Sequence, residues 1–382
     1  MRALGIDPGT MSFDVVVIEG DKVVREEVVE TRTVAENPER LIEAVERAGE
    51  VDIIAGPSGY GVEVTWLKDV PEELVEDWYL TYILLLKRED MERALAQGNV
   101  GIMVYYAMVR TASEMKRRGW PVVYIPGVIH LPTVPPHRKV YKIDMGTADK
   151  MCIAALGVYD QAEKYSVPFS EVSFILVEMG FGYNAVLGVE GGRIVDGVGG
   201  TLGGPGFLTI GRVDAEIAQL VGSWEKADMF TGGGMSISGR ASPEELADCL
   251  DFDERCEMAW NAMVEEVVKN VAGMKAIVKE PREILISGRL TRVPRLEDDL
   301  MKRLSELGEV RRIGSLKGAA RSKEAAQGYA LVAEGLAGGF FRELVEWMKI
   351  GEAKGTVLDY IFHEKIGLVR SLFEKYEVRK PS

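Results

Sequence analysis

Residues 1–24, MRALGIDPGTMSFDVVVIEGDKVV, decide the fold of this chain. An apolar run over residues 3–6 ends in Asp7, and the next three residues, Pro-Gly-Thr, supply turn chemistry. Proline fixes one φ, and glycine permits a backbone position that a Cβ would block. A second apolar strand leaves this turn and reverses at residues 19–21, Glu-Gly-Asp. The stretch therefore predicts a β-hairpin with a small-residue loop at its root.

The predicted loop suits phosphate oxygens. It exposes successive backbone N–H groups, including that of Gly9, and the hydroxyls of Thr10 and Ser12. Asp7, at the end of the strand, is suited to hold Mg²⁺ through water. The plain alternative is an ordinary β-hairpin with a surface Asp-Pro-Gly turn, and this stretch alone leaves both interpretations open.

Length and composition limit the class of protein. A chain of 382 residues with 47% hydrophobic and 28% charged residues predicts two globular domains, with three as the outer limit. The net charge of −14 argues against a nucleic-acid partner or an anionic membrane surface. Because no apolar run approaches about 18 residues and the chain enters a strand directly, we expect no membrane span, no leader and a cytoplasmic location.

The cysteines predict neither a disulfide framework nor a zinc site. There are three, Cys152, Cys249 and Cys256, an odd number without metal-ligand spacing. We therefore expect reduced thiols.

The first half of the chain alternates helix and strand as α/β proteins do. A helical pattern over 38–48 precedes a buried strand at 51–55, which ends in the glycine-rich loop 56–61. Loops beyond strand ends face the ligand crevice in such sheets, which makes Ser58 and Tyr60 substrate-side candidates. The alternative is a tight turn that simply needs its glycines.

The second half repeats the plan of the N-terminus. After a helix that reaches about residue 164 and a strand at 172–177, residues 178–212 read EMGFGYNAVLGVEGGRIVDGVGGTLGGPGFLTIGR. We interpret this as three strands joined by glycine turns, with Gly180 and Gly182 in a second phosphate loop. The repetition suggests two similar halves that close on one ligand. A glycine-rich β-meander without a ligand is the alternative.

A third loop follows a later strand. The strand at 283–286 ends in Ser287, Gly288 and Arg289, where glycine lets the backbone approach a flat ring or a phosphate. Residues 325–339, AAQGYALVAEGLAGG, predict a small-residue helix that can pack closely on a neighbouring element.

Together these segments resemble a known superfamily. The stretches IDPGTMSFDVVVIEGDKVV, KIDMGTADKMCIAA, VEMGFGYNAVLGVEGGRIVDGVGGTLGGPGF, ILISGRL and EAAQGYALVAEGLAGG resemble, in this order, the acetate and butyrate kinase branch of the acetate and sugar kinase, heat-shock ATPase and actin (ASKHA) superfamily. Within the branch the chain looks most like an archaeal group of predicted butyrate kinases. The resemblance covers about residues 1–338.

The resemblance implies an α/β fold of two ribonuclease H-like domains with a nucleotide cleft between them. It places the first domain at 1–136 and the second at 137–339, and we expect residues 340–382 to form a helical extension that docks on the body. ATP and Mg²⁺ are the implied cofactors.

The resemblance also assigns site residues. Asp7 would hold Mg²⁺, and Ser287, Gly288 and Arg289 would contact adenosine. The residues implied around the phosphates are Gly9, Thr10, Ser12, Gly180 and Gly182. Arg212, just past the last glycine loop, matches the family's transition-state arginine, although its flanking residues differ. The alternative for Arg212 is a surface arginine that pairs with Asp214.

The chain departs from acetate kinases where the acceptor would bind. Met145 stands where they have an active-site histidine, and Pro126 stands where they have an aspartate. An ionised carboxylate acceptor needs no general base, so a short-chain carboxylate remains the first expectation. A hydroxyl acceptor would need a base, for which Asp144 or Asp149 is available, and that keeps a sugar or polyol kinase open. A conformational ATPase and a catalytically inactive scaffold are further alternatives, and we leave open whether the chain forms a homodimer.

Overall fold

The structure is a computed structural model that describes residues 1–96, 100–367 and 369. Contacts divide the chain into two compact units. The first comprises residues 1–143, 147–156 and 315–382, and the second comprises 144–146 and 157–314. Among the described residues, no helix is both long enough and apolar enough to cross a membrane.

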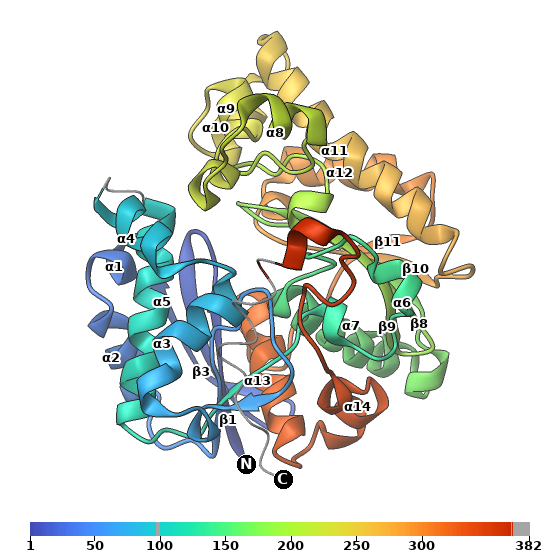
Figure 1. Cartoon of the computed structure of the whole chain (residues 1–382). Coiled ribbons are helices and arrows are strands. Elements are labelled where there is room, and N and C mark those ends of the chain that lie inside the picture. Colours follow the sequence, from blue (N-terminus) through green and yellow to red (C-terminus); the bar gives the residue numbers. More distant parts are fainter. Residues whose placement is uncertain (97–99, 368, 370–382) are drawn as a thin grey trace. The chain divides into compact units, whose positions relative to one another are not determined.

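The first unit is built on a six-stranded sheet (Figure 1). Its strands, in the spatial order β3-β2-β1-β4-β6-β5, are β1 (Arg2–Pro8), β2 (Ser12–Glu19), β3 (Lys22–Glu30), β4 (Ile53–Ala55), β5 (Thr65–Trp66) and β6 (Val122–Tyr124). Its helices are α1 (Thr31–Glu36), α2 (Glu39–Arg47), α3 (Val75–Trp78), α4 (Arg88–Ala96), α5 (Val100–Arg117), α6 (Pro136–Lys139), α13 (Glu324–Leu336) and α14 (Arg342–Trp347). The predicted hairpin is confirmed, because β1 and β2 pair as antiparallel neighbours from Arg2↔Glu19 to Pro8↔Phe13.

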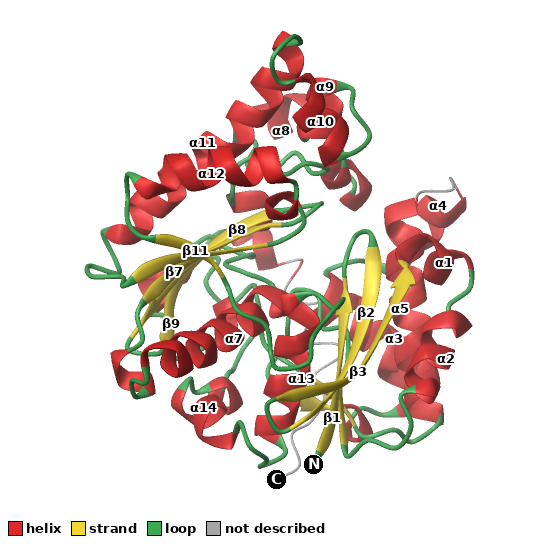
Figure 2. Cartoon of the chain, turned by 180° about the vertical axis from the view of Figure 1, so that it is seen from behind, coloured by secondary structure: helices red, strands yellow, loops and turns green. Residues whose placement is uncertain are grey.

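The second unit is built on a five-stranded sheet (Figure 2). Its strands, in the order β11-β10-β7-β8-β9, are β7 (Phe174–Met179), β8 (Asn184–Glu190), β9 (Arg193–Gly199), β10 (Glu283–Ser287) and β11 (Val310–Arg312). Its helices are α8 (Ala215–Val221), α9 (Gly234–Ser238), α10 (Pro243–Cys249), α11 (Glu254–Lys275) and α12 (Pro294–Ser305). Helix α7 (Ala148–Tyr165) contributes its residues through Leu156 to the first unit and the rest to the second.

The two sheets share one topology. In each, three consecutive strands form an antiparallel meander, and two parallel strands continue the sheet from the first strand of that meander. The order β3-β2-β1-β4-β6 thus corresponds to β9-β8-β7-β10-β11. This correspondence agrees with the predicted duplication, and the predicted α/β fold of two similar halves is confirmed.

The compact units do not follow the order of the chain. Residues 315–382 belong to the first unit, although we expected a second domain over 137–339. The reason is that α13 packs on β1, and α14 packs on α13 in turn. The domain boundaries at 136 and 339 stay a prediction that these units do not reproduce. Of the expected extension 340–382, residues 368 and 370–382 lie outside the described part of the chain.

Helix α13 touches the sheet through glycine. A Cβ on Gly5 of β1 would lie 2.4 Å from both the Ala326 carbonyl oxygen and the Ala330 amide nitrogen. A Cβ on Gly328 would lie 2.3 Å from the carbonyl oxygen of Cys152 on α7. Both contacts are with backbone, which cannot turn aside as a flexible side chain could. Two glycines therefore let α13 lie against a strand on one side and a helix on the other.

We expect Gly5→Ala to destabilise the protein by about 1 to 3 kcal/mol, because the added methyl must push α13 off β1. The measurement is chemical denaturation with both variants in parallel. Gly273→Ala is the matched control, since Gly273 lies on the exposed face of α11 with nothing within 4 Å of the added Cβ. The control should be neutral or stabilising by up to about 1 kcal/mol. Equal effects of the two changes would contradict the close α13–β1 contact.

His130 is a buried titratable group of the first unit. Its side chain is 3% exposed, and its Nδ1 lies 3.3 Å from the Gly127 carbonyl oxygen. Burial lowers the His130 pKa from 6.5 to about 4, and nearby Lys139 lowers it further, while the Gly127 carbonyl and Asp359 act in the opposite direction. Between pH 6.5 and 4 the unfolded chain therefore binds a proton that the folded chain does not.

The sign of this difference means that stability is lost as pH falls from 6.5 to about 4, by up to about 3 kcal/mol. His130→Gln should flatten the pH dependence of the unfolding free energy in that window. His137→Gln is the matched control, because His137 is exposed. Unfolding curves at pH 7, 5.5 and 4.5 measure the slopes, and an unchanged slope in His130→Gln would refute a neutral buried His130.

Candidate functional site

The N-terminal loop carries two buried carboxylates. Asp7, at the end of β1, pairs in register with Asp14 of β2, and the two residues are 4% and 1% exposed. The Ser12 hydroxyl donates to Asp14 Oδ1 at 2.6 Å. The Thr31 hydroxyl donates to the Gly9 carbonyl oxygen at 2.7 Å and holds the loop from the side of α1. Hence the loop is ordered around acidic groups, and Thr10 at its tip is exposed.

Lys323 places an ammonium group in this loop. Its Nζ lies 3.4 Å from Asp7 Oδ2 and 3.2 Å from Asp14 Oδ1, and it donates to the Ser12 carbonyl oxygen at 2.9 Å. A Cβ on Gly9 would lie 2.3 Å from this nitrogen. Glycine at position 9 therefore makes room for the cation as well as for the turn.

Asp7 has a strongly perturbed carboxyl group. Burial raises its pKa from 3.8 to about 6, and the charges of Asp149 and Asp14 act in the same direction. Lys323 is the largest opposing influence. Because burial and the neighbouring acids disfavour the ionised form of Asp7, a further cation beside it would stabilise that form. The donor set therefore fits Mg²⁺ bound to Asp7 through water.

The start of α7 lies in the same unit. Asp149 accepts hydrogen bonds from the Thr147 hydroxyl and the Lys150 ammonium. Burial alone would raise the Asp149 pKa, but Lys150 and Thr147 outweigh it, and the pKa is lowered. Asp149 therefore stays ionised and is already engaged. Among the described residues, no cluster of three or more His, Cys, Asp or Glu side chains forms a complete protein metal site.

The second glycine loop lies between β7 and β8. The Gly180 N–H donates to the Tyr183 carbonyl oxygen at 3.0 Å, which closes the turn. The Gly182 carbonyl oxygen accepts from the Thr209 hydroxyl at 2.7 Å, and a Cβ on Gly206 would lie 1.9 Å from it. The later glycine stretch thus packs directly on the predicted phosphate loop.

The third loop approaches the second through Glu178. Gly288 has φ +104°, and a Cβ there would lie 2.8 Å from Glu178 Oε1. A Cβ on Gly180 would lie 3.1 Å from the same oxygen. Ser287 is 1% exposed, and Arg289 forms an ion pair with Glu244 of α10. The second unit therefore brings the Gly180 and Gly288 loops together around one carboxylate.

Arg212 and Asp144 both lie in the second unit. Arg212 is 56% exposed and pairs with Glu266 of α11, not with Asp214. It lines an open hollow of about 290 Å³ beside Gly204. Asp144 is 8% exposed, and its Oδ1 accepts from the Gly146 N–H at 2.8 Å. Arg212 is thus a surface arginine in an ion pair, as the alternative expected, but its partner is Glu266 and not Asp214. Asp144 serves to hold a turn.

Ser58 and Tyr60 lie in the loop after β4. Ser58 is fully buried, and its hydroxyl donates to the Gly56 carbonyl oxygen at 2.7 Å and accepts from the Ile125 N–H at 3.1 Å. Tyr60 is half-buried, and its N–H donates to the Ile83 carbonyl oxygen at 3.0 Å. The Ser58 side chain therefore holds the loop, and the substrate roles of both residues stay predictions.

Sequence reasoning missed Lys323 and Glu178. Glu178 had a usable signal, because it precedes Gly180 by two residues as Asp7 precedes Gly9. Lys323 had only a weak signal, its position directly before the small-residue helix. Its loop partners lie more than 300 residues away in the chain.

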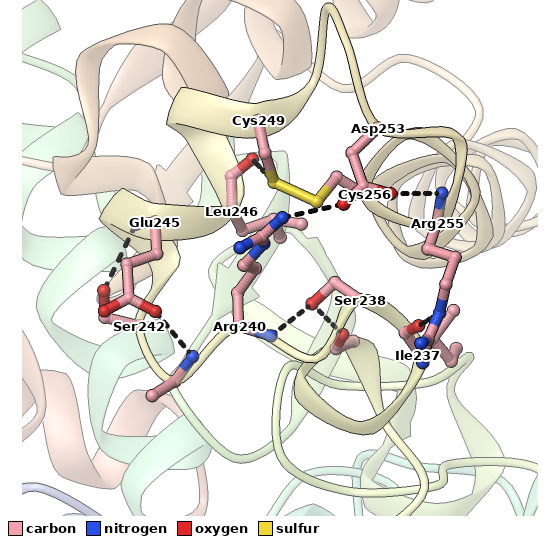
Figure 3. Close-up of a disulfide and its surroundings, with 12 residues drawn as sticks. Ile237, Ser238, Arg240, Ser242, Glu245, Leu246, Cys249, Asp253, Arg255 and Cys256 are labelled. Atoms are coloured by element: carbon pink, nitrogen blue, oxygen red, sulfur yellow. Dashed lines mark hydrogen bonds and ion pairs between the residues drawn. A yellow bond between two sulfur atoms is a disulfide. The ribbon is translucent and has the colours of Figure 1, made fainter.

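The cysteine prediction is wrong for two of the three residues. Cys249 and Cys256 form a disulfide with a Cα–Cα distance of 5.9 Å (Figure 3). The turn between α10 and α11 brings both side chains into one buried core, and Arg240 pairs with Asp253 beside them. The disulfide thus ties α11 to the helix that carries Glu244. Cys152 is the free, buried cysteine.

Solved structures of acetate and propionate kinases resemble the chain. Acetate kinase from Porphyromonas gingivalis matches with a TM-score of 0.55 and 13% identity over 88% of this chain and 99% of that one. Acetate kinase from Entamoeba histolytica matches with a TM-score of 0.54 and 12% identity over 81% of this chain and 87% of that one. A propionate kinase from Francisella tularensis subsp. tularensis SCHU S4 matches with a TM-score of 0.54 and 11% identity over 86% of this chain and 98% of that one. At these identities the likeness establishes the two-domain α/β fold of acetate kinase type.

A family model of the sequence identifies the protein family more narrowly than the fold does. The chain belongs to the DUF1464 family, described as proteins of unknown function, whose profile matches residues 5–363. No curated protein matches the sequence significantly.

We expect that alkylation of the denatured protein without reductant modifies Cys152 alone, and that all three cysteines react after reduction. In the folded protein Cys152 should stay unmodified, because it is buried and burial raises the pKa of its thiol. Intact mass counts the adducts. Cys249→Ser is the control, since it frees Cys256 and should add one adduct to the unreduced sample. Labelling of Cys249 and Cys256 before reduction would show that the bond is absent.

Proposed function

We propose that this protein is an ATP-dependent kinase that transfers the γ-phosphoryl group of Mg²⁺-ATP to a small molecule. A short-chain carboxylate is the first acceptor class. The observation that carries the proposal is the glycine loop in which Asp7 and Asp14 hold an ammonium group. A second glycine loop, beginning at Gly180, follows the corresponding strand of the other sheet and adds support.

Phosphoryl transfer depends mainly on positioning and charge neutralisation. In our proposal the backbone N–H groups around Gly9 and Gly180 hold phosphate oxygens, and the loop at Gly288 lies against adenosine. Asp7 holds Mg²⁺ through water. The ion, when bound, neutralises negative charge on the phosphates and orients them.

Arg212 remains the proposed transition-state cation. Its guanidinium group can meet two phosphate oxygens at once. The present partner, Glu266, is not an obstacle, because exposed ion pairs contribute little and exchange readily.

The proposed acceptor class is based on the hydrogen bonds that the candidate acidic side chains already accept. A carboxylate acceptor is ionised at neutral pH and needs no general base. Asp144 and Asp149, the acids considered as bases for a hydroxyl acceptor, already accept hydrogen bonds from their own turns. Met145 and Pro126 are buried and offer no polar group. These observations favour a carboxylate over a sugar or polyol.

The narrower parts of the proposal rest on the sequence resemblance. We place the chain beside the archaeal butyrate kinase-like group, with butyrate as the first acceptor to test and the cytoplasm as its location. A homodimer is compatible with this proposal and is not required by it.

The decisive experiment measures ADP release from Mg²⁺-ATP with acetate, propionate, butyrate, glucose and glycerol in turn. We expect release that depends on a carboxylate. Asp7→Asn should lower turnover about 100-fold while changing nucleotide affinity much less, because Asp7 acts through the metal. Asp298→Asn, on the exposed face of α12, is the matched control and should behave as wild type.

Other outcomes decide between the alternatives. ADP release that no acceptor stimulates would favour a conformational ATPase. Absence of Mg²⁺-dependent binding of ATP or GTP at millimolar nucleotide in wild type would overturn the proposal.

A further inference from the structure

The charge of the N-terminal loop is unfavourable for a polyphosphate. Two buried carboxylates, Asp7 and Asp14, face the ammonium group of Lys323. The nearby charges of Asp149 and Lys150 also act on Asp7, but these two residues pair with each other. A triphosphate adds several negative charges, and an acidic chain of net charge −14 must gather cations locally to accept them. The Lys323 ammonium group, which already lies in the loop, is therefore needed to offset the negative charge of any phosphate bound there.

The Lys323 side chain is held by its ammonium group and is partly exposed. Its three partners are Asp7 Oδ2, Asp14 Oδ1 and the Ser12 carbonyl oxygen, all on the two strands that flank the loop. The side chain is 32% exposed, although both carboxylates are buried. Lysine is a point charge on a flexible stem, so its donors can exchange one oxygen partner for another. It can thus serve a phosphate without leaving the loop.

A carboxylate on the neighbouring strand fixes the segment that carries Lys323. Glu26 of β3 accepts hydrogen bonds from three successive backbone N–H groups, those of Ala320, Arg321 and Ser322, at 3.0 to 3.1 Å. The Ser322 hydroxyl donates to the same carboxylate at 2.5 Å. Burial would raise the Glu26 pKa, but these hydrogen bonds outweigh it and lower the pKa.

The segment has a second anchor farther back. The Val23 N–H donates to the Lys317 carbonyl oxygen at 2.8 Å, so residues 317–322 follow β3. Lys323 comes next, and its own N–H donates to Asp14 Oδ2 at 3.0 Å. Because α13 begins at Glu324, the lysine is fixed from both sides.

We propose that Lys323 is the protein cation that contacts the nucleotide phosphates in the N-terminal loop, and that Glu26 is its positioning residue. The inference rests on the proposed function and adds a residue to that site. Lys323 neutralises Asp7 and Asp14 in the free protein and exchanges part of this coordination for phosphate oxygens when nucleotide binds. Glu26 touches no ligand and acts through the backbone of 320–322.

The test compares the affinity for Mg²⁺-ATP with that for adenosine by calorimetry. Lys323→Met should weaken Mg²⁺-ATP binding about 10- to 100-fold, as for the loss of a charge-assisted hydrogen bond, and leave adenosine binding within about 2-fold. Lys323→Arg should retain part of the Mg²⁺-ATP affinity. Lys317→Met is the matched control, because Lys317 lies on the same segment but is 72% exposed and pairs with Asp21.

If Lys323→Met fails to fold, a second variant tests the same role without changing the net charge of the loop. Lys323→Met combined with Asp14→Asn removes one positive and one negative charge together, and it should show the same selective loss of Mg²⁺-ATP binding. Glu26→Gln should lower the ratio of ATP to adenosine affinity about 3- to 10-fold. Glu27→Gln on the same strand is its control, since Glu27 pairs with Arg47 and Arg25 instead.

The outcomes separate the two proposals. If wild type binds Mg²⁺-ATP and the Lys323 variants keep the wild-type ratio of affinities, the role of Lys323 is refuted and the proposed function stands. If wild type does not bind Mg²⁺-ATP, both are refuted. A fall in melting temperature without a change in the ratio would assign Lys323 and Glu26 purely structural roles and would also refute the inference.

Discussion

The first unit depends on the direct contact between β1 and α13 at Gly5. A helix and a strand can approach this closely only where no side chain intervenes, and a Cβ at Gly5 would lie 2.4 Å from backbone atoms of α13. The contact fixes the axis of α13 against the strand that ends in Asp7. Since α13 begins one residue after Lys323, the same contact determines where that ammonium group lies. The packing of α13 and the position of the positive charge in the loop therefore both depend on Gly5, which lies more than 300 residues from Lys323 in the chain.

Much of the fold could be predicted from local sequence signals. The N-terminal hairpin followed from a turn flanked by apolar runs, and the strands β8 and β9 followed from glycine punctuation in the same way. Helix α7 was expected to reach about residue 164 and ends at Tyr165. These predictions succeeded because turn chemistry and apolar periodicity act over a few residues. The repetition of the two hairpins indicated two similar halves, and the structure adds that the two sheets share a strand order.

The features that the sequence did not reveal depend on contacts between distant segments. Nothing near residue 315 indicates that the chain returns to the first sheet, and the domain boundaries at 136 and 339 stay a prediction. The disulfide between Cys249 and Cys256 depends on how the turn after α10 aims two side chains, which spacing alone does not reveal. Asp7 and Gly9 could be selected from their own loop, but their cation partner could not. The burial of Ser58 likewise depends on Ile125 and the strand beside it.

The assignment of α13 to the first unit has a consequence for biosynthesis. Residues 157–314 are contiguous, so the second unit has nearly all of its chain once residue 314 leaves the ribosome. The first unit, whose strands are made earliest, must wait for residues 324–336 to cover β1. During that interval the Gly5 face of the sheet lies open, and open apolar sheet surface invites aggregation or chaperone binding. The order of synthesis is thus the reverse of the order in which the two units can be completed.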